Sequence, residues 1–175
     1  NIRTMFEAIE GERIVVLRGY SSSRSQKRDR YVEPYAFLPG NRDVRCFEIS
    51  TRTNKTFNLS RAESVEMVDL RWTYRDEHRP LLVDLFHFSG ESTTLVTLRL
   101  GVLAKSVLLD EYPQAERRLT QEDESHWLWV DEFCSMKGVG RFVMGLLEDI
   151  EIVDAPELEA YIVEQVSRAA SRFVQ

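Results

Sequence analysis

Cysteine and histidine are scarce in this sequence of 175 residues, which contains two cysteines and three histidines. Cys46 and Cys134 stand in apolar contexts without the paired spacing of a zinc site. We therefore expect buried free thiols in a reducing compartment, with a disulfide as the alternative. The histidines, His78, His87 and His126, fall in separate segments and lack metal-ligand spacing. We expect no metal site and no cofactor.

Long apolar runs are also absent. No stretch approaches the roughly 18 apolar residues of a membrane-spanning helix, and no secretory leader pattern opens the chain. These absences predict a cytoplasmic protein. The chain starts at Asn1 directly in helical sequence, which suggests a piece of a longer protein.

Catalytic motifs are missing as well. There is no Gly-x-Ser-x-Gly, and Gly138-Val-Gly140 precedes a predicted helix without the Lys-Ser/Thr of a phosphate loop. We therefore expect that the protein is not an enzyme. One alternative is a hydrolase or metal site that uses the acidic cluster at 148–154, which we interpret instead as a solvated strand edge; its members are Glu148, Asp149, Glu151 and Asp154.

Basic residues, by contrast, are concentrated in one stretch. Residues 13–61 contain eleven Lys or Arg against four Asp or Glu, a net charge of +7 within a chain of net charge -6. A basic surface on an acidic molecule predicts an anion-binding face, because guanidinium groups make bidentate contacts with phosphate. A basic surface that is merely solvated is the alternative.

Short strands repeat along this basic stretch after an amphipathic helix near the N-terminus. Residues 21–29 contain no apolar side chain, so we expect an exposed hairpin loop there. Pro34 indicates a strand end or an edge position. A single helical turn precedes the last strand. The expected strands are 12–18, 30–37, 43–50, 55–59 and 65–68, and their order predicts a five-stranded SH3-like β-barrel.

The second half of the chain has a different pattern and a net charge of -9 over residues 80–175. Its order, strand-helix-strand-strand-helix-strand, is that of a ferredoxin-like α/β domain, and an additional helix follows at 156–173. The fold class is therefore α+β. We expect a barrel domain over 1–70 with its N-terminal helix, a linker over 71–91 and a ferredoxin-type domain over 92–175.

Several motifs of the chain resemble the WYL domain of bacterial transcription regulators and its C-terminal extension, WCX. The WYL motifs are Val32-Glu-Pro34, Val44-Arg-Cys-Phe-Glu-Ile49, Thr56-Phe-Asn-Leu-Ser-Arg61 and Val65-Glu-Met-Val68. The WCX motifs are Glu111-Tyr-Pro113, the helix over 138–147 and the strand before Pro156. The resemblance implies an SH3-like barrel joined to a ferredoxin-like domain, with a winged helix before Asn1 that binds duplex DNA.

The resemblance also implies a polar, basic cluster in the barrel that binds single-stranded nucleic acid or a nucleotide-like ligand. Cys46 replaces the tyrosine of the family's namesake tripeptide, and Asn58 replaces the first arginine of its Phe-Arg-Leu-Asp-Arg-Ile box. The predicted ligand-binding residues are Arg61, Arg30, Arg45, Ser21, Ser22, Asn58 and Cys46. We expect the three arginines to converge on one barrel face. The structural alternative for Arg61 is an ion pair with Glu33 or capping of backbone carbonyls.

The function implied by the resemblance is the effector-sensing and dimerising region of a WYL-type transcription regulator. A scaffold that pairs subunits and has lost ligand binding is the main alternative. We expect a homodimer, because the helix over 156–173 carries an apolar stripe; packing of this stripe on its own sheet is the competing explanation. The stripe consists of Leu158, Tyr161, Ile162, Val166, Ala169 and Phe173.

Overall fold

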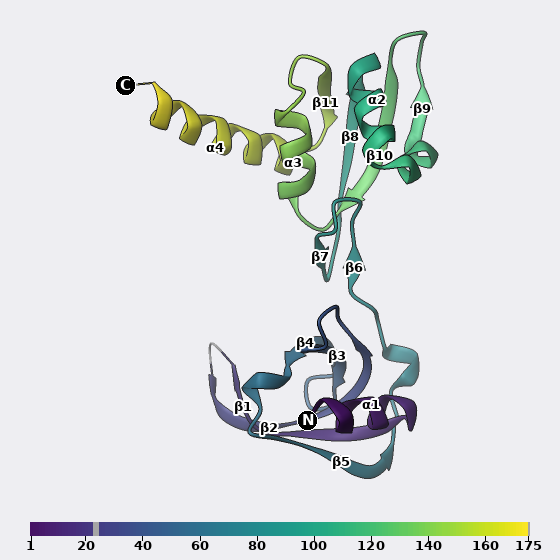
Figure 1. Ribbon diagram of the computed structural model, residues 1–175, viewed down its shortest axis with the longest axis vertical. Helices are drawn as coiled ribbons and strands as arrows, with labels where there is room; N and C mark the ends of the chain where they lie inside the picture. The colour runs from purple at the N-terminus through teal and green to yellow at the C-terminus, as the bar shows by residue number, and fades with distance from the viewer. Residues whose placement is uncertain (23–24, 175) are drawn as a thin grey trace. The chain divides into compact units, whose positions relative to one another are not determined.

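The computed structural model describes residues 1–22 and 25–174 of the chain (Figure 1). The chain divides into two compact units, Asn1–Pro80 and Leu81–Gln175. The segment predicted as a linker, 71–91, is therefore shared between the two units. Each unit has its own hydrophobic core.

The first unit contains one antiparallel sheet of five strands. Its strand order is β4-β3-β2-β1-β5, and the short helical turn η1 (Leu59–Arg61) precedes the last strand, as the sequence predicted. The other elements are α1 (Ile2–Glu10), β1 (Arg13–Ser22), β2 (Ser25–Phe37), β3 (Asp43–Glu48), β4 (Thr53–Asn58) and β5 (Ser64–Arg71).

This sheet is open, and the prediction of a closed barrel is not met. In the described part of the chain, β4 and β5 form the two edges of the sheet and do not pair with each other. Helix α1 packs on the sheet and contributes Met5 and Ala8 to the core, beside Val15, Leu17 and Val32 of β1 and β2. Helix α1 thus covers the apolar face of the sheet, which in a closed barrel would be covered by the barrel's other strands.

The hairpin of β1 and β2 is longer than the sequence predicted. The strands include residues 21, 22 and 25–29, which we expected in a loop; residues 23 and 24 lie outside the described part. Cross-strand ion pairs extend the ladder where apolar residues are lacking, including Arg18 with Asp29 at 2.6 Å. A strand made of polar residues has no alternation of apolar and polar side chains, so a prediction based on that alternation misses it.

Pro34 lies in an internal strand instead of an edge strand. β2 pairs with both β1 and β3, but its pairing with β1 ends near Val32, whereas Pro34 pairs with Cys46 of β3. At Pro34 the strand is therefore a local edge, which explains why a residue without a backbone N–H is tolerated there.

The second unit begins with a two-stranded hairpin of β6 (Leu82–Val83) and β7 (Ser89–Gly90). A four-stranded antiparallel sheet of order β11-β8-β10-β9 follows. The elements are β8 (Thr94–Leu100), α2 (Val102–Glu111), η3 (Pro113–Arg118), β9 (Leu119–Gln121), β10 (Trp127–Phe133), α3 (Met136–Met144), β11 (Ile150–Asp154) and α4 (Pro156–Phe173). The order of strands and helices is the one that the sequence predicted, and the molecule is of mixed α+β class.

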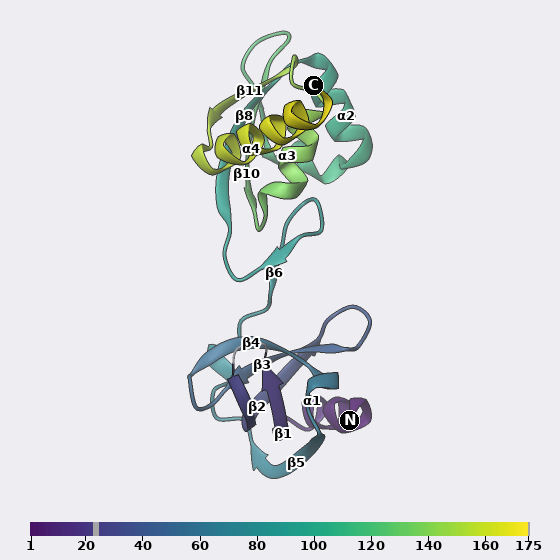
Figure 2. The same ribbon diagram turned by 90° about the vertical axis from the view of Figure 1, so that its left-hand side faces the viewer.

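Helices of the second unit pack on one face of its sheet (Figure 2). Alternate residues of β8, Val96, Leu98 and Leu100, join residues of α2, α3 and α4 in a single buried cluster. Trp129 and Phe133 of β10 belong to the same cluster.

Candidate functional site

Arg30 is buried in the first unit, with 7% of its surface exposed. Its Nη1 donates to Glu48 Oε1 at 2.8 Å, and Glu48 is itself fully buried. Glu48 Oε2 also accepts from Thr51 Oγ1 at 2.6 Å and from Lys55 Nζ. Burial by itself raises the pKa of Glu48, but the hydrogen bonds from Lys55, Thr51 and Arg30 outweigh it and hold this pKa below its ordinary value. This network neutralises Arg30.

Arg45 lies on the opposite face of the sheet from this network. Its neighbours along β3, Val44 and Cys46, point into the core cluster, so Arg45 points to the other face. Its Nε donates to the carbonyl of Arg79 at 3.1 Å, and 1% of the residue is exposed. The prediction that the three arginines share one open face is therefore wrong.

The face that carries Arg45 is covered by residues 72–79, which the sequence placed in a linker. Trp72 Nε1 donates to the carbonyl of Arg13 at 3.0 Å, and the Tyr74 ring packs on Phe47 at 5.0 Å. Tyr35 Oη lies 2.6 Å from the carbonyl of Arg79, and burial raises the pKa of this phenol. The segment buries both apolar and polar groups of the sheet.

Glu33 holds this covering segment in place. Its fully buried carboxylate accepts from the backbone N–H of Thr73 at 2.5 Å and of Tyr74 at 3.1 Å, and lies 2.8 Å from His78 Nε2. The proposed structural pair of Arg61 with Glu33 is therefore wrong, because these groups occupy both carboxylate oxygens. His78 and Glu33 act structurally, and no local sequence signal marks them as partners 45 residues apart.

Ser21, Asn58 and Arg61 do come together, around η1. Ser21 Oγ donates to the carbonyl of Arg61 at 3.4 Å. The Asn58 side chain accepts from the backbone N–H of Ser60 at 3.0 Å, and the Asn58 N–H donates to Tyr20 Oη at 3.2 Å. These contacts hold η1 and the end of β4 against the end of β1.

The guanidinium of Arg61 is exposed and, within the described residues, has no hydrogen-bond or ion-pair partner. Ser22 is partly buried and already engaged in an interaction. Cys46 is fully buried with Sγ 3.7 Å from the Val44 carbonyl, and burial raises the pKa of its thiol. Of the predicted set, Arg61 is thus the arginine with a guanidinium on open surface.

The second unit contains a cleft of about 590 Å³, and a smaller cleft, of about 350 Å³, lies beside η1 in the first unit. Asn58 and Ser60 line this smaller cleft, together with Arg42, which the sequence analysis did not select. Arg42 follows the Gly40-Asn41 turn, where both residues have positive φ, and its carbonyl accepts from Leu59 N–H at 2.9 Å. The turn brings this second exposed arginine to η1.

Much of the basic charge of the first unit is compensated. Acidic residues that lie beyond the basic stretch pair with it: Glu63 with Lys27, Glu66 with Arg18, and Asp69 with Arg13. The net charge of +7 that the sequence gives for residues 13–61 therefore overstates the free positive charge of the folded sheet.

The acidic cluster of the second unit has structural partners. Asp149 Oδ2 accepts from the backbone N–H of Ala104 at 2.7 Å, and Glu151 Oε2 accepts from Arg99 at 2.8 Å. Among residues 1–22 and 25–174, no group of three or more His, Cys, Asp or Glu is arranged to hold a metal ion. Both cysteines are free. No helix in the described part is long and apolar enough to span a membrane.

Comparison with known proteins finds similarity to solved structures. No protein-family model and no curated protein matches the chain. The chain is similar to the proteasome accessory factor B/C (PafBC) of Arthrobacter aurescens, with 20% sequence identity and a TM-score of 0.48 over 99% of this chain. The chain spans 27% of the length of PafBC.

Proposed function

We propose that this chain is the effector-sensing region of a WYL-type transcription regulator and that its first unit binds an anionic ligand at η1. The ligand class is single-stranded nucleic acid or a nucleotide. The exposed, unpartnered guanidinium of Arg61, within the described residues, is the observation that carries the proposal. Duplex DNA is not among the ligands that we propose for these two units.

The chemistry of η1 suits a phosphate group. Arg61 supplies a planar guanidinium, which makes paired hydrogen bonds with phosphate oxygens. Arg42 adds a second cation in the cleft beside η1, and Asn58 and Ser60 add polar groups. The contact of Ser21 with the Arg61 carbonyl fixes the backbone from which the guanidinium extends.

Arg30 and Arg45 support the sheet in this proposal and do not contact the ligand. Both are buried, and their partners are Glu48 and the carbonyl of Arg79. Ser22 and Cys46 are likewise assigned to the support of the sheet. The ligand surface therefore contains Arg61, Arg42, Asn58 and Ser60, with Ser21 behind it.

The alternative is a scaffold that pairs subunits without sensing a ligand. The burial and neutralisation of Arg30 favour it, since a guanidinium bound to a buried carboxylate does not offer charge to a ligand. In both cases we propose a homodimer, which the exposed apolar residues of α4 support.

The first prediction tests Arg61 directly. Binding of a fluorescein-labelled oligothymidylate to the full chain, followed by anisotropy, should weaken in Arg61→Ala by roughly 1–3 kcal/mol, the range for hydrogen bonds to charged groups. Affinity should also fall as salt rises, because phosphate contacts release counterions. Unlabelled ATP should compete if a nucleotide is the ligand class.

Arg71→Ala is the matched control. Arg71 is an exposed arginine at the far end of β5, seven residues from Ser64. Arg71→Ala removes one positive charge, as Arg61→Ala does, but it should leave the affinity for the oligothymidylate unchanged. Equal losses in the two variants would indicate nonspecific attraction. Lack of oligothymidylate and ATP binding by the unmodified chain would favour the scaffold.

A further inference from the structure

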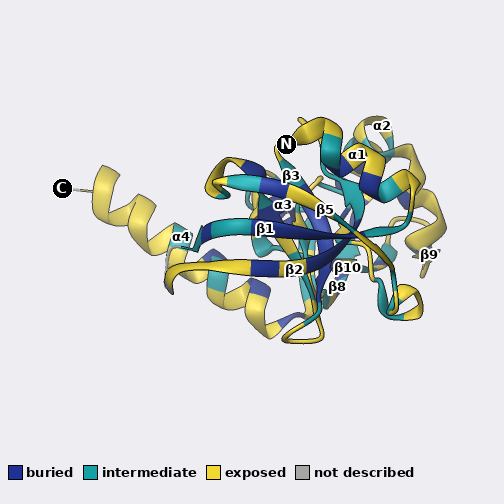
Figure 3. Cartoon of the chain, turned by 90° about the horizontal axis from the view of Figure 1, so that it is seen from below, coloured by how far each residue is buried: buried dark blue, intermediate teal, exposed yellow. Residues whose placement is uncertain are grey.

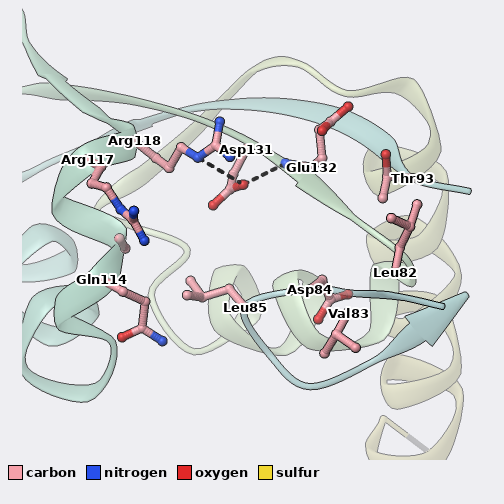
Figure 4. Close-up of a pocket in the computed structure, with 11 residues that line it drawn as sticks. Leu82, Val83, Asp84, Leu85, Thr93, Gln114, Arg117, Arg118, Asp131 and Glu132 are labelled. Atoms are coloured by element: carbon pink, nitrogen blue, oxygen red, sulfur yellow. Dashed lines mark hydrogen bonds and ion pairs between the residues drawn. The ribbon is translucent and has the colours of Figure 1, made fainter. Parts of the chain in front are cut away.

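The second unit contains the larger cavity, with a volume of about 590 Å³, which lies within the range of small-ligand sites (Figure 4). Three walls enclose it: the segment 82–85, the helical turn η3, and β10 at Asp131 and Glu132. All of its lining residues belong to the second unit, so the cavity is separate from the surface at η1.

The cavity lies against a bare stretch of sheet edge. β10 pairs with β8 over its whole length, from Trp127 to Phe133, but with β9 only from Trp127 to Trp129. Residues 130–133 therefore have a strand neighbour on one side alone. Asp131 and Glu132, which point to opposite faces of the sheet, both line the cavity, as expected for a cavity at a strand edge.

Two of the carboxylates in the cavity are already used by the fold. Asp84 is buried and accepts from the backbone N–H groups of Phe86, Phe88 and Cys134, at 2.9, 3.1 and 3.0 Å. Asp131 Oδ1 accepts from the Glu132 N–H at 2.8 Å and lies 3.8 Å from Arg118 Nε. Neither offers an uncompensated negative charge to a ligand.

The remaining charges stand at opposite ends of the cavity. Arg117 and Glu132 are exposed, and neither side chain has a hydrogen-bond or ion-pair partner in the described part of the chain. Figure 4 shows Arg117 and Arg118 at one end, and Glu132 with Thr93 at the other. Leu85 lies between these ends, and Leu82 and Val83 lie on the side of Glu132 and Thr93, so apolar side chains of the 82–85 segment line the cavity along its length.

A ligand complementary to this cavity has a carboxylate at one end, an ammonium at the other and apolar groups between them. We propose that the cavity binds a short linear peptide with free termini. Its carboxylate contacts Arg117 and Arg118, its ammonium contacts Glu132, and its side chains pack on Leu82 and Leu85. A simple anion would bind Arg117 and Arg118 but would be repelled by the carboxylate of Glu132, which disfavours a simple anion as the ligand. The extended backbone lies along the bare edge of β10.

The test is titration of the full ¹⁵N-labelled chain with glycyl-leucine, and with the tri- and tetrapeptides that extend it with glycine at the N-terminus. Chemical-shift changes are expected in residues 82–85, 93, 114–118 and 131–132. Acetylation of the N-terminus and amidation of the carboxyl group should each weaken binding about tenfold or more, because each removes one charge-assisted contact.

Two variants report on the two ends of the cavity. Arg117→Ala should lose about tenfold in affinity and become insensitive to amidation, while Glu132→Ala should become insensitive to acetylation. Lys137→Ala and Glu159→Ala remove exposed charges from α3 and α4 and should leave affinity unchanged. No shift with any of the three peptides, or equal binding of the blocked peptides, would overturn the proposal. Its outcome is independent of oligothymidylate binding at η1.

Discussion

Burial gives the arginines of the first unit different roles although they look alike in sequence. Arg30 is 7% exposed and pairs with fully buried Glu48, whereas Arg61 is exposed and unpartnered in the described part of the chain. The Nε of Arg30 is also buried without a hydrogen-bond partner among the described residues. Removal of the Glu48 carboxylate from this guanidinium would leave a buried charge without compensation, which is costly.

The second prediction concerns Glu48→Gln. At neutral pH the variant should lose about 3 kcal/mol of unfolding free energy in urea, since Arg30 then faces a neutral amide. The pKa of Glu48 is lowered from the reference value of 4.5, so its ionised form stabilises the fold above that pH. The advantage of the unmodified chain over the variant should therefore shrink as the pH falls below 4.5 and through the lower folded-state pKa.

The control for this variant is Glu159→Gln, which changes an exposed glutamate on α4. Urea unfolding at several pH values, followed by circular dichroism, measures both variants. A difference between Glu48→Gln and the unmodified chain that stays constant with pH would contradict the role given to the Glu48 carboxylate.

At the scale of elements, α2 is capped by a residue that is distant in sequence. The Asp149 carboxylate accepts from the N–H of Ala104 in the first turn of α2, a donor that has no partner within the helix. The carboxylate approaches so closely that a Cβ on Gly101 would lie 2.0 Å from Asp149 Oδ1. Glycine is therefore needed at the start of this helix, and Asp149 completes it.

The third prediction is that Asp149→Ala destabilises the second unit by about 1–2 kcal/mol, the cost of losing a helix cap. Glu148→Ala, at the exposed neighbouring residue, should change the unfolding free energy by less than about 0.5 kcal/mol. Urea unfolding monitored by the helical circular dichroism signal compares them. Equal effects of the two substitutions would count against the cap.

At the scale of the molecule, the second half of α4 is exposed and carries several apolar residues (Figure 3). Leu158 and Ile162 are buried in the unit's own core, so the competing explanation for the apolar stripe holds for the first half of the helix. Val166 and Phe173 are 47% and 77% exposed. They continue the stripe at helical spacing and suit the proposed homodimer.

The fourth prediction is that the chain is a dimer in light scattering at high micromolar concentration and that Val166→Asp with Phe173→Asp makes it monomeric. Two buried charges cannot be accommodated in an apolar helix interface. Ser167→Asp, at an exposed polar residue on the opposite side of α4, adds charge to the helix outside this stripe and should leave the dimer intact. A monomeric unmodified chain would remove the dimer from the proposed function.

The sequence by itself determined the elements of this protein and their order. Local periodicity, turn residues and the change of charge after residue 79 predicted the helices, most of the strands and the order strand-helix-strand-strand-helix-strand, because these depend on neighbouring residues.

The tertiary structure alone decided which faces are covered. Glu33 binds residues 73–78, Asp149 caps α2, and the basic stretch meets acids of β5. These contacts join residues about 40 or more positions apart, so no local pattern encodes them. Arg30 and Arg45 were consequently buried on opposite faces, while Arg61 remained exposed.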